Sequence, residues 1–170
     1  MCMLELMEEY LIDKFFYLSY MKDCIFCSIV RGEAECVKLW EDDGFMAILD
    51  INPNTKGCTL VIPKKHHDSY VFDMDDGVYQ RFFLACREVS KMLEKGLGVK
   101  RVGMVFEGLG VNHAHIKLYP IHGLKDTFQE LFSERTVYFD KYEGYLTTEM
   151  GPRKNYDELR KVAEEIKHNL

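Results

Sequence analysis

The 170-residue sequence has no apolar run approaching the ~20 residues that a membrane-spanning helix needs. It also has no surplus of positive charge, because 28 acidic residues outnumber 22 basic ones and leave a formal net charge of −6. Proteins that bind along a nucleic-acid backbone neutralise its phosphates with basic side chains. We therefore expect neither a membrane nor a nucleic acid among the partners, and a deadenylase acting on nucleic-acid ends is disfavoured. Apolar residues at 47% and charged residues at 29% are ordinary for one globular domain.

The N-terminal segment lacks the features of a secretory signal. Such a signal has a basic start, an uninterrupted apolar stretch and a small-residue cleavage site, whereas acidic residues interrupt this segment. Its apolar residues instead recur at helical spacing, at Leu4, Met7, Leu11 and Phe15. We expect residues 1–22 to be a helical N-terminal extension or, if Met21 is the native start, an upstream addition. The expected location is the cytoplasm, with the nucleus left open.

Of the six cysteines, only Cys24 and Cys27 are closely spaced. In a reducing compartment they are thiols or metal ligands rather than a structural disulfide. The Cys-x-x-Cys spacing suits a zinc site, which takes four thiolate or imidazole ligands. A redox pair and two buried thiols are the alternatives, although a redox pair normally opens a helix within a βαβ unit, which this region does not indicate.

Short apolar runs separated by turn residues indicate an α+β fold. One long amphipathic helix is predicted over 75–95, with Gly96 and Gly98 as stop signals. A C-terminal helix is predicted after Asn155, which has the spacing of a capping box with Glu158. The expected strands are 37–40, 45–49, 59–62, 102–106 and 113–119.

The last of these strands carries the residues that point most directly to chemistry. Successive side chains of a strand face opposite sides, so His113, His115 and Lys117 are expected on one face. Two imidazoles and an ammonium in a row suit a phosphate group, and a solvated strand with incidental histidines is the alternative.

Four segments together resemble the histidine triad (HIT) family. The resemblance covers about 24–120 with all motifs in order. It divides the chain into the N-terminal extension, a HIT domain at 23–123 and a C-terminal extension at 124–170 that packs on this domain or extends a dimer interface. The matching segments are Cys24–Glu33, Leu49–Pro53, Gly57–His66 and His113–Lys117.

The resemblance implies an antiparallel sheet with flanking helices, a homodimer, and a hydrolase or nucleotidyl transferase that acts at the α-phosphate of a nucleotide. His115 corresponds to the nucleophile, which forms a nucleotidyl-histidine intermediate. The zinc-carrying branch of the family further implies one structural Zn²⁺ per chain. The matching metal ligands are Cys24, Cys27, His66 and His113.

The resemblance also implies a nucleotide pocket. Asp50 matches the carboxylate that accepts hydrogen bonds from the ribose, and the phosphoryl oxygens would be met by Lys117, Asn112 and amides near Gly108 and Gly110. Taken alone, the apolar positions are equally typical of a hydrophobic core. The matching base-holding positions are Phe26, Ile29, Ile48 and Ile51.

Two positions depart from the family pattern within the phosphate site. Lys117 replaces the third histidine of the triad, and Cys58 stands where a further histidine is common. The loop 107–112 also lacks a glutamine found in many members, and Phe106 replaces an asparagine. Lysine is a poor proton shuttle at neutral pH. We therefore expect an altered hydrolase of an AMP or GMP derivative, such as a phosphoramidate or a dinucleoside polyphosphate. The alternative is a nucleotide-binding protein with weak or no catalysis.

Overall fold

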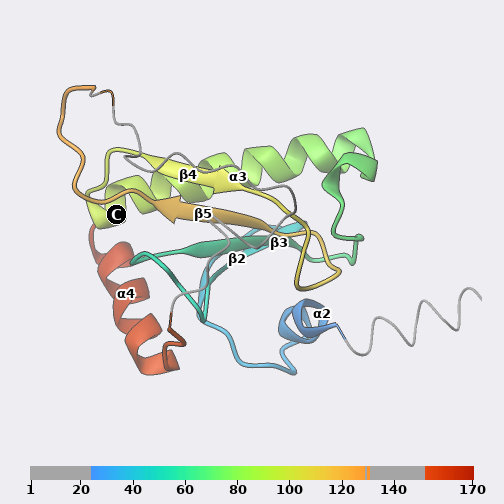
Figure 1. Ribbon diagram of the computed structural model, residues 1–170. Coiled ribbons are helices and arrows are strands. Elements are labelled where there is room, and N and C mark those ends of the chain that lie inside the picture. Colours follow the sequence, from blue (N-terminus) through green and yellow to red (C-terminus); the bar gives the residue numbers. More distant parts are fainter. Residues whose placement is uncertain (1–23, 129, 131–151) are drawn as a thin grey trace, which may run out of the picture.

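The computed structural model describes residues 24–128, 130 and 152–170 (Figure 1), so the predicted N-terminal helix lies outside the described residues. No helix in the described ranges is long and apolar enough to cross a membrane. The elements are α2 (Ile25–Val30), β1 (Lys38–Glu41), β2 (Phe45–Leu49), β3 (Thr59–Pro63), a 3₁₀ turn (Val71–Asp73), α3 (Asp76–Leu97), β4 (Val102–Val105), β5 (Ile116–Pro120) and α4 (Tyr156–His168).

The five strands form one antiparallel sheet in the order β1-β2-β3-β5-β4. The predicted α+β class and antiparallel sheet are confirmed. The predicted strand at 113–119 begins only at Ile116, because the chain before it is held by a loop instead of a neighbouring strand. There the Ala114 amide donates to the His67 carbonyl at 2.8 Å. His113 and His115 therefore precede β5.

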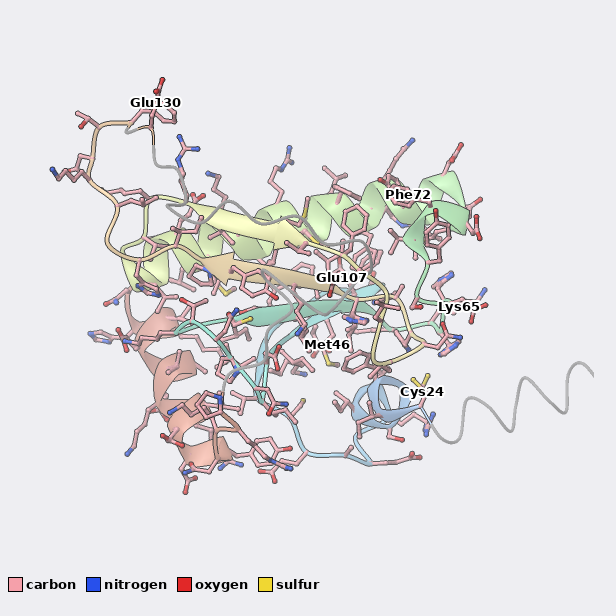
Figure 2. All side chains as sticks on the ribbon, in the orientation of Figure 1. Cys24, Met46, Lys65, Phe72, Glu107 and Glu130 are labelled. Atoms are coloured by element: carbon pink, nitrogen blue, oxygen red, sulfur yellow. The ribbon has the colours of Figure 1, made fainter. Side chains whose placement is uncertain are left out.

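Both faces of the sheet are covered, which explains why β2 and β3 are buried along their whole length. Alternate residues such as Ala47 and Leu49 pack under α3, while Met46 and Ile48 pack against α2 on the other face (Figures 1 and 2). Two-sided burial accounts for the continuous apolar runs in these strands. The short helix α2 is thereby fixed on the face opposite α3.

The long helix α3 has clear signals at both ends. Asp75 caps its start by accepting hydrogen bonds from the Gly77 and Val78 amides. Gly98 ends it with φ at 65°, a left-handed conformation that glycine adopts without steric penalty. Gly96 has another role, since a Cβ there would lie 2.5 Å from the Ile166 carbonyl oxygen of α4. The missing side chain lets α4 pack directly on α3.

The C-terminal segment packs on the same sheet-and-helix unit. The predicted capping box of Asn155 and Glu158 is present, and α4 contacts α3 and β1. Just before α4, the Lys154 amide donates to the carbonyl of Ile51 at 2.9 Å, which fastens this segment to the loop after β2. Tyr156 donates its hydroxyl to the Glu35 carbonyl at 3.1 Å. Residues 153–156 are thus held beside the end of β2.

Candidate functional site

Two thiols and two imidazoles meet at the N-terminal end of α2. Cys24 is the residue before the helix and Cys27 lies one turn along it, so both sulfurs reach the same point. His66 follows β3 and His113 precedes β5. All four side chains are buried, and their candidate ligand atoms lie within 4.8 Å of one another. The structure therefore brings together all four predicted metal ligands.

The spacing of this cluster, Cys24/Cys27/His66/His113, suits a tetrahedral metal. The Cys24 Sγ lies 3.4 Å from His113 Nδ1, and Cys27 Sγ lies 3.3 Å from His66 Nδ1. Zinc–sulfur bonds near 2.3 Å and zinc–nitrogen bonds near 2.1 Å imply sulfur–nitrogen edges of about 3.6 Å. Both cysteines are free thiols without a disulfide. Donor set and spacing thus fit Zn²⁺.

Burial controls the charge of the cluster. Desolvation and, to a smaller extent, the neighbouring Cys24 together raise the pKa of Cys27 to about 11. Desolvation also lowers the pKa of His113 to about 4, so this imidazole is neutral at pH 7. His113 donates through Nε2 to the Pro63 carbonyl at 2.9 Å, which leaves the Nδ1 lone pair facing the sulfurs. A dication would convert such thiols to thiolates.

A hydrogen bond to the backbone of His113 orients the His115 ring. Its Nδ1 lies 2.7 Å from the His113 carbonyl oxygen, which can only accept, so Nδ1 carries the proton. The Nε2 lone pair is then available. Desolvation lowers the pKa of His115, and its ring packs 5.4 Å from the Phe26 ring. A neutral imidazole with one nitrogen fixed and the other unprotonated has the properties of a nucleophile.

His115 lines a cavity of about 520 Å³, a size typical of small-molecule sites. The four predicted base-holding residues all line it, and Phe26 and Ile48 also belong to the buried apolar cluster around α2. The apolar lining is Ile25, Phe26, Ile29, Ile48, Leu49, Ile51, Leu60, Val105, Leu109 and Val111. The charged and titratable lining is Glu35, Cys36, Asp50, Glu107, His115, Lys117, Arg153 and Tyr156.

Lys117 forms an ion pair with Asp50 inside this cavity. The Nζ lies 3.2 Å from Asp50 Oδ2, and the two side chains are 23% and 7% exposed. The other carboxylate oxygen, Oδ1, accepts from the Asn52 amide at 2.8 Å. Asp50, the predicted acceptor for the ribose hydroxyls, therefore already has two donors. One of them is Lys117, which replaces the third histidine of the family triad.

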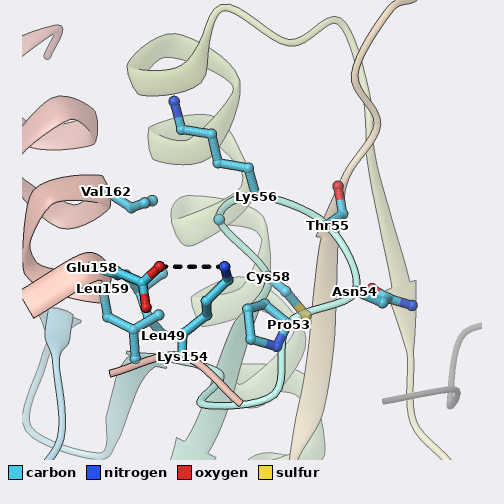
Figure 3. A pocket seen from close by; sticks show the side chains of 11 residues that line it. Leu49, Pro53, Asn54, Thr55, Lys56, Cys58, Lys154, Glu158, Leu159 and Val162 are labelled. Carbon is cyan, nitrogen blue, oxygen red and sulfur yellow. Dashed lines mark hydrogen bonds and ion pairs between the residues drawn. The ribbon is translucent and has the colours of Figure 1, made fainter. Parts of the chain in front are cut away.

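Cys58 lies beside Asp50 and does not line this cavity. Its Sγ is 4.0 Å from Asp50 Oδ2. Burial, followed by the Asp50 charge, raises the pKa of Cys58 to about 12, so it is a neutral thiol. It lines a second cavity of about 340 Å³ between the 53–58 loop and α4, where Lys154 pairs with Glu158 (Figure 3).

The predicted phosphoryl donors are only partly brought to the cavity. Gly110 and Lys117 line it, but Asn112 does not. The Asn112 amide accepts from the Ser69 backbone at 2.9 Å and donates to Asp68 at 3.1 Å. Gly108 supports the same loop contact, since a Cβ there would lie 2.7 Å from the Ser69 carbonyl oxygen. Asn112 thus positions the loop 107–112, on which Glu107 is labelled in Figure 2.

Two lining residues, Arg153 and Tyr156, are absent from the sequence-based site. They reach the cavity because the Lys154 amide binds the Ile51 carbonyl. No motif or spacing in the sequence marks them, since their position depends on how α4 packs.

Comparison with known proteins identifies the fold. The HIT domain family model matches residues 31–123. An uncharacterized HIT-like protein of Borreliella burgdorferi is 38% identical over 107 residues, which are 59% of this chain and 76% of that protein. Adenylylsulfatase HINT3 of Arabidopsis thaliana is 56% identical over 107 residues, 60% of this chain, and the chain spans about half (54%) of that relative.

Among solved structures, a zinc-bound histidine triad family protein from Mycobacterium smegmatis aligns with a TM-score of 0.59 at 22% identity. The alignment covers 87% of this chain and 96% of that one. The family model matches more than half of the chain, and the strand order and helices agree with this fold. The chain belongs to the histidine triad family, and its triad reads His113-x-His115-x-Lys117.

Proposed function

We propose that the protein cleaves a nucleoside 5′-phosphate derivative at its α-phosphate, with His115 as the nucleophile. The observation that carries this proposal is the fixed, neutral imidazole of His115 in a cavity that also holds Asp50 and Lys117. Membership of the HIT family and the similarity to a relative named adenylylsulfatase support it.

The reaction has two balanced steps. The His115 Nε2 lone pair forms a bond to phosphorus while the bond to the leaving group breaks, and the electron pair departs with that group. A water oxygen then forms a bond to phosphorus while the phosphorus–nitrogen bond breaks, its electron pair returns to Nε2, and one water proton passes to solvent. The nucleoside monophosphate is released and the neutral imidazole is restored. Splitting a difficult displacement in this way lowers the barrier of each step.

The cavity suggests how the nucleotide lies. The base is held between apolar side chains such as Ile29, Ile48 and Ile51, which line one part of the cavity. Asp50 accepts from the ribose hydroxyls, since each carboxylate oxygen has a second lone pair. Lys117 faces the phosphate, because an ammonium stabilises the negative charge that grows on the phosphoryl oxygens.

We assign the cluster Cys24/Cys27/His66/His113 to one structural zinc ion per chain. Four protein ligands complete the tetrahedral shell, so the ion supplies folding stability and no reactive water. The zinc-bound structural neighbour supports this assignment. Reduced thiols at this site fit the expected cytoplasmic location.

A measurement of turnover separates this function from the alternative, nucleotide binding without catalysis. The replacements at Lys117 and Cys58 favour that alternative. We expect the purified protein to release AMP from at least one of adenylyl sulfate, adenosine 5′-phosphoramidate and a diadenosine polyphosphate, followed by chromatography. AMP itself should bind in calorimetry. Binding of AMP without release from any of the three compounds would leave the protein a nucleotide-binding module.

A second copy of the chain is the partner we propose. Among the described strands, β4 lies at the edge of the sheet, and a run of aromatic rings continues from it. Tyr70 and Phe72 are 59% and 61% exposed, and the Phe72 ring lies 5.4 Å from that of Phe106. Exposed aromatic patches beside an edge strand are typical of interfaces. We expect light scattering to give a mass of about twice 20.0 kDa, and a dimer that is weaker in F72D; a monomeric wild type would refute this.

A further inference from the structure

We propose that Lys117 makes the enzyme selective for leaving groups that depart as anions, namely sulfate, phosphate or carboxylate, over amines. This inference rests on the function proposed above and deepens it. It identifies the substrates as mixed anhydrides of a nucleotide rather than phosphoramidates.

The position of Lys117 is fixed by the fold. It lies in β5 between Leu60 of β3 and Val105 of β4, two residues after His115, so both side chains face the same cavity. Its ion pair with Asp50 is mostly buried, which strengthens the attraction relative to water. One of the three N–H donors is directed to Asp50 and two are left for an anion.

A lysine in this arrangement does not act as a proton shuttle. If the ammonium gave up a proton to a leaving group, the Asp50 carboxylate would lose its ionic partner while remaining buried. Leaving one member of a buried ion pair unpaired is strongly unfavourable. A histidine at this position would carry no such penalty, because imidazole titrates near neutral pH.

The two classes of leaving group differ in their need for a proton. Cleavage of a phosphorus–nitrogen bond expels a very basic nitrogen anion unless the nitrogen is protonated as the bond breaks. Sulfate, phosphate and carboxylate take the electron pair of the breaking phosphorus–oxygen bond and leave as stable anions. The fixed charge of Lys117 lowers the energy of the more negative transition state for such groups.

The described lining holds other groups that can carry a proton, namely Tyr156, the Cys36 thiol, Glu107 and Glu35, which pairs with Arg160. Tyr156 already donates its hydroxyl to the Glu35 carbonyl. The Cys58 thiol lines the neighbouring cavity instead. Glu107 lines the cavity, and its charge acts on His115. Glu107 and Cys36 are therefore the groups that controls must test.

The experiment compares substrates that share one nucleotide. The kcat/KM of wild type is measured for adenylyl sulfate, for adenosine 5′-phosphoramidate, and for adenosine 5′-aryl phosphates that differ only in the acidity of the phenol. We expect wild type to prefer adenylyl sulfate by about 10²-fold or more, since general acid catalysis contributes at least that much to an amine substrate. Its rate on the aryl esters should fall steadily as the phenol becomes less acidic.

Variants at position 117 control for the intrinsic reactivity of the substrates. K117H should reduce the ratio of kcat/KM for adenylyl sulfate to that for the phosphoramidate about tenfold or more, because phosphoramidate turnover rises. Its rate on the aryl esters should depend less on the acidity of the phenol. K117R keeps the charge without a transferable proton and should keep the wild-type preference. E107Q and C36S should each leave the ratio of kcat/KM for adenylyl sulfate to that for the phosphoramidate unchanged.

The outcomes separate the two proposals. Equal turnover of adenylyl sulfate and the phosphoramidate by wild type overturns the proposal that Lys117 makes the enzyme selective. An unchanged preference for adenylyl sulfate in K117H overturns it as well. Loss of phosphoramidate turnover in E107Q assigns the proton to Glu107 and also overturns it. No turnover of any compound by wild type overturns the proposed function itself. If K117H does not fold, the aryl esters test the proposal with wild type alone. A wild-type rate that does not fall as the phenol becomes less acidic then overturns the selectivity.

Discussion

The variant H115A releases AMP about 10³-fold or more slowly than wild type, in the range found when a nucleophile is removed from an enzyme. The reason is geometric, because His115 alone among the described cavity residues combines a fixed Nδ1 donor with a free Nε2 lone pair. Mass spectrometry of acid-quenched wild type is expected to find a nucleotidyl adduct on the His115 peptide, and the variant should lack it.

A second histidine variant makes this result specific. His168 is exposed near the end of α4, so H168A should keep wild-type turnover. The melting temperature and metal content of H115A should match wild type, which separates chemistry from folding. Turnover by H115A at the wild-type rate would show that His115 is not the nucleophile.

Removal of the metal has the largest expected effect on stability. Metal analysis of purified protein should find about one zinc per chain, and C27S should hold almost none. Structural zinc contributes to folding directly. Because loss of a bound metal is among the changes with unusually large effects on stability, a loss of about 5 kcal/mol in the free energy of unfolding is expected. For a chain of this size that corresponds to a melting temperature lower by about 10–20 °C.

Cys36 offers a matched control for the metal site. It is a half-buried free thiol outside the cluster Cys24/Cys27/His66/His113. C36S should therefore retain zinc and most of the wild-type melting temperature, while chelation of wild type should reproduce the loss seen in C27S. A chelated, metal-free wild type that melts at the same temperature as the zinc-loaded protein would contradict the structural role.

The parts of the fold that the sequence predicts well depend on local signals. The span of β2, the Asp75 cap of α3 and the capping box of α4 follow from residues within a few positions of one another. The cluster of metal ligands was predicted through a family pattern, since nothing local joins Cys24 to His113. The boundary of β5 was wrong because the loop holding Ala114 competes with strand pairing.

The finer features of the site depend on tertiary packing. Nothing in the sequence indicates that Lys117 pairs with Asp50, that Asn112 binds Asp68 and Ser69, or that Arg153 reaches the cavity. Each of these contacts joins segments far apart in the chain. Their prediction requires the strand register and the placement of α4, which only the three-dimensional structure supplies.

The anchoring of residues 153–156 beside Ile51 sets the order in which the site is completed during synthesis. Every other lining residue of the cavity has been added to the chain by Lys117, but Arg153 and Tyr156 come from the segment at the start of α4. A nascent chain that ends before this segment would present a cavity with one wall missing. The cavity reaches its final shape only after residues 153–156 have been synthesised.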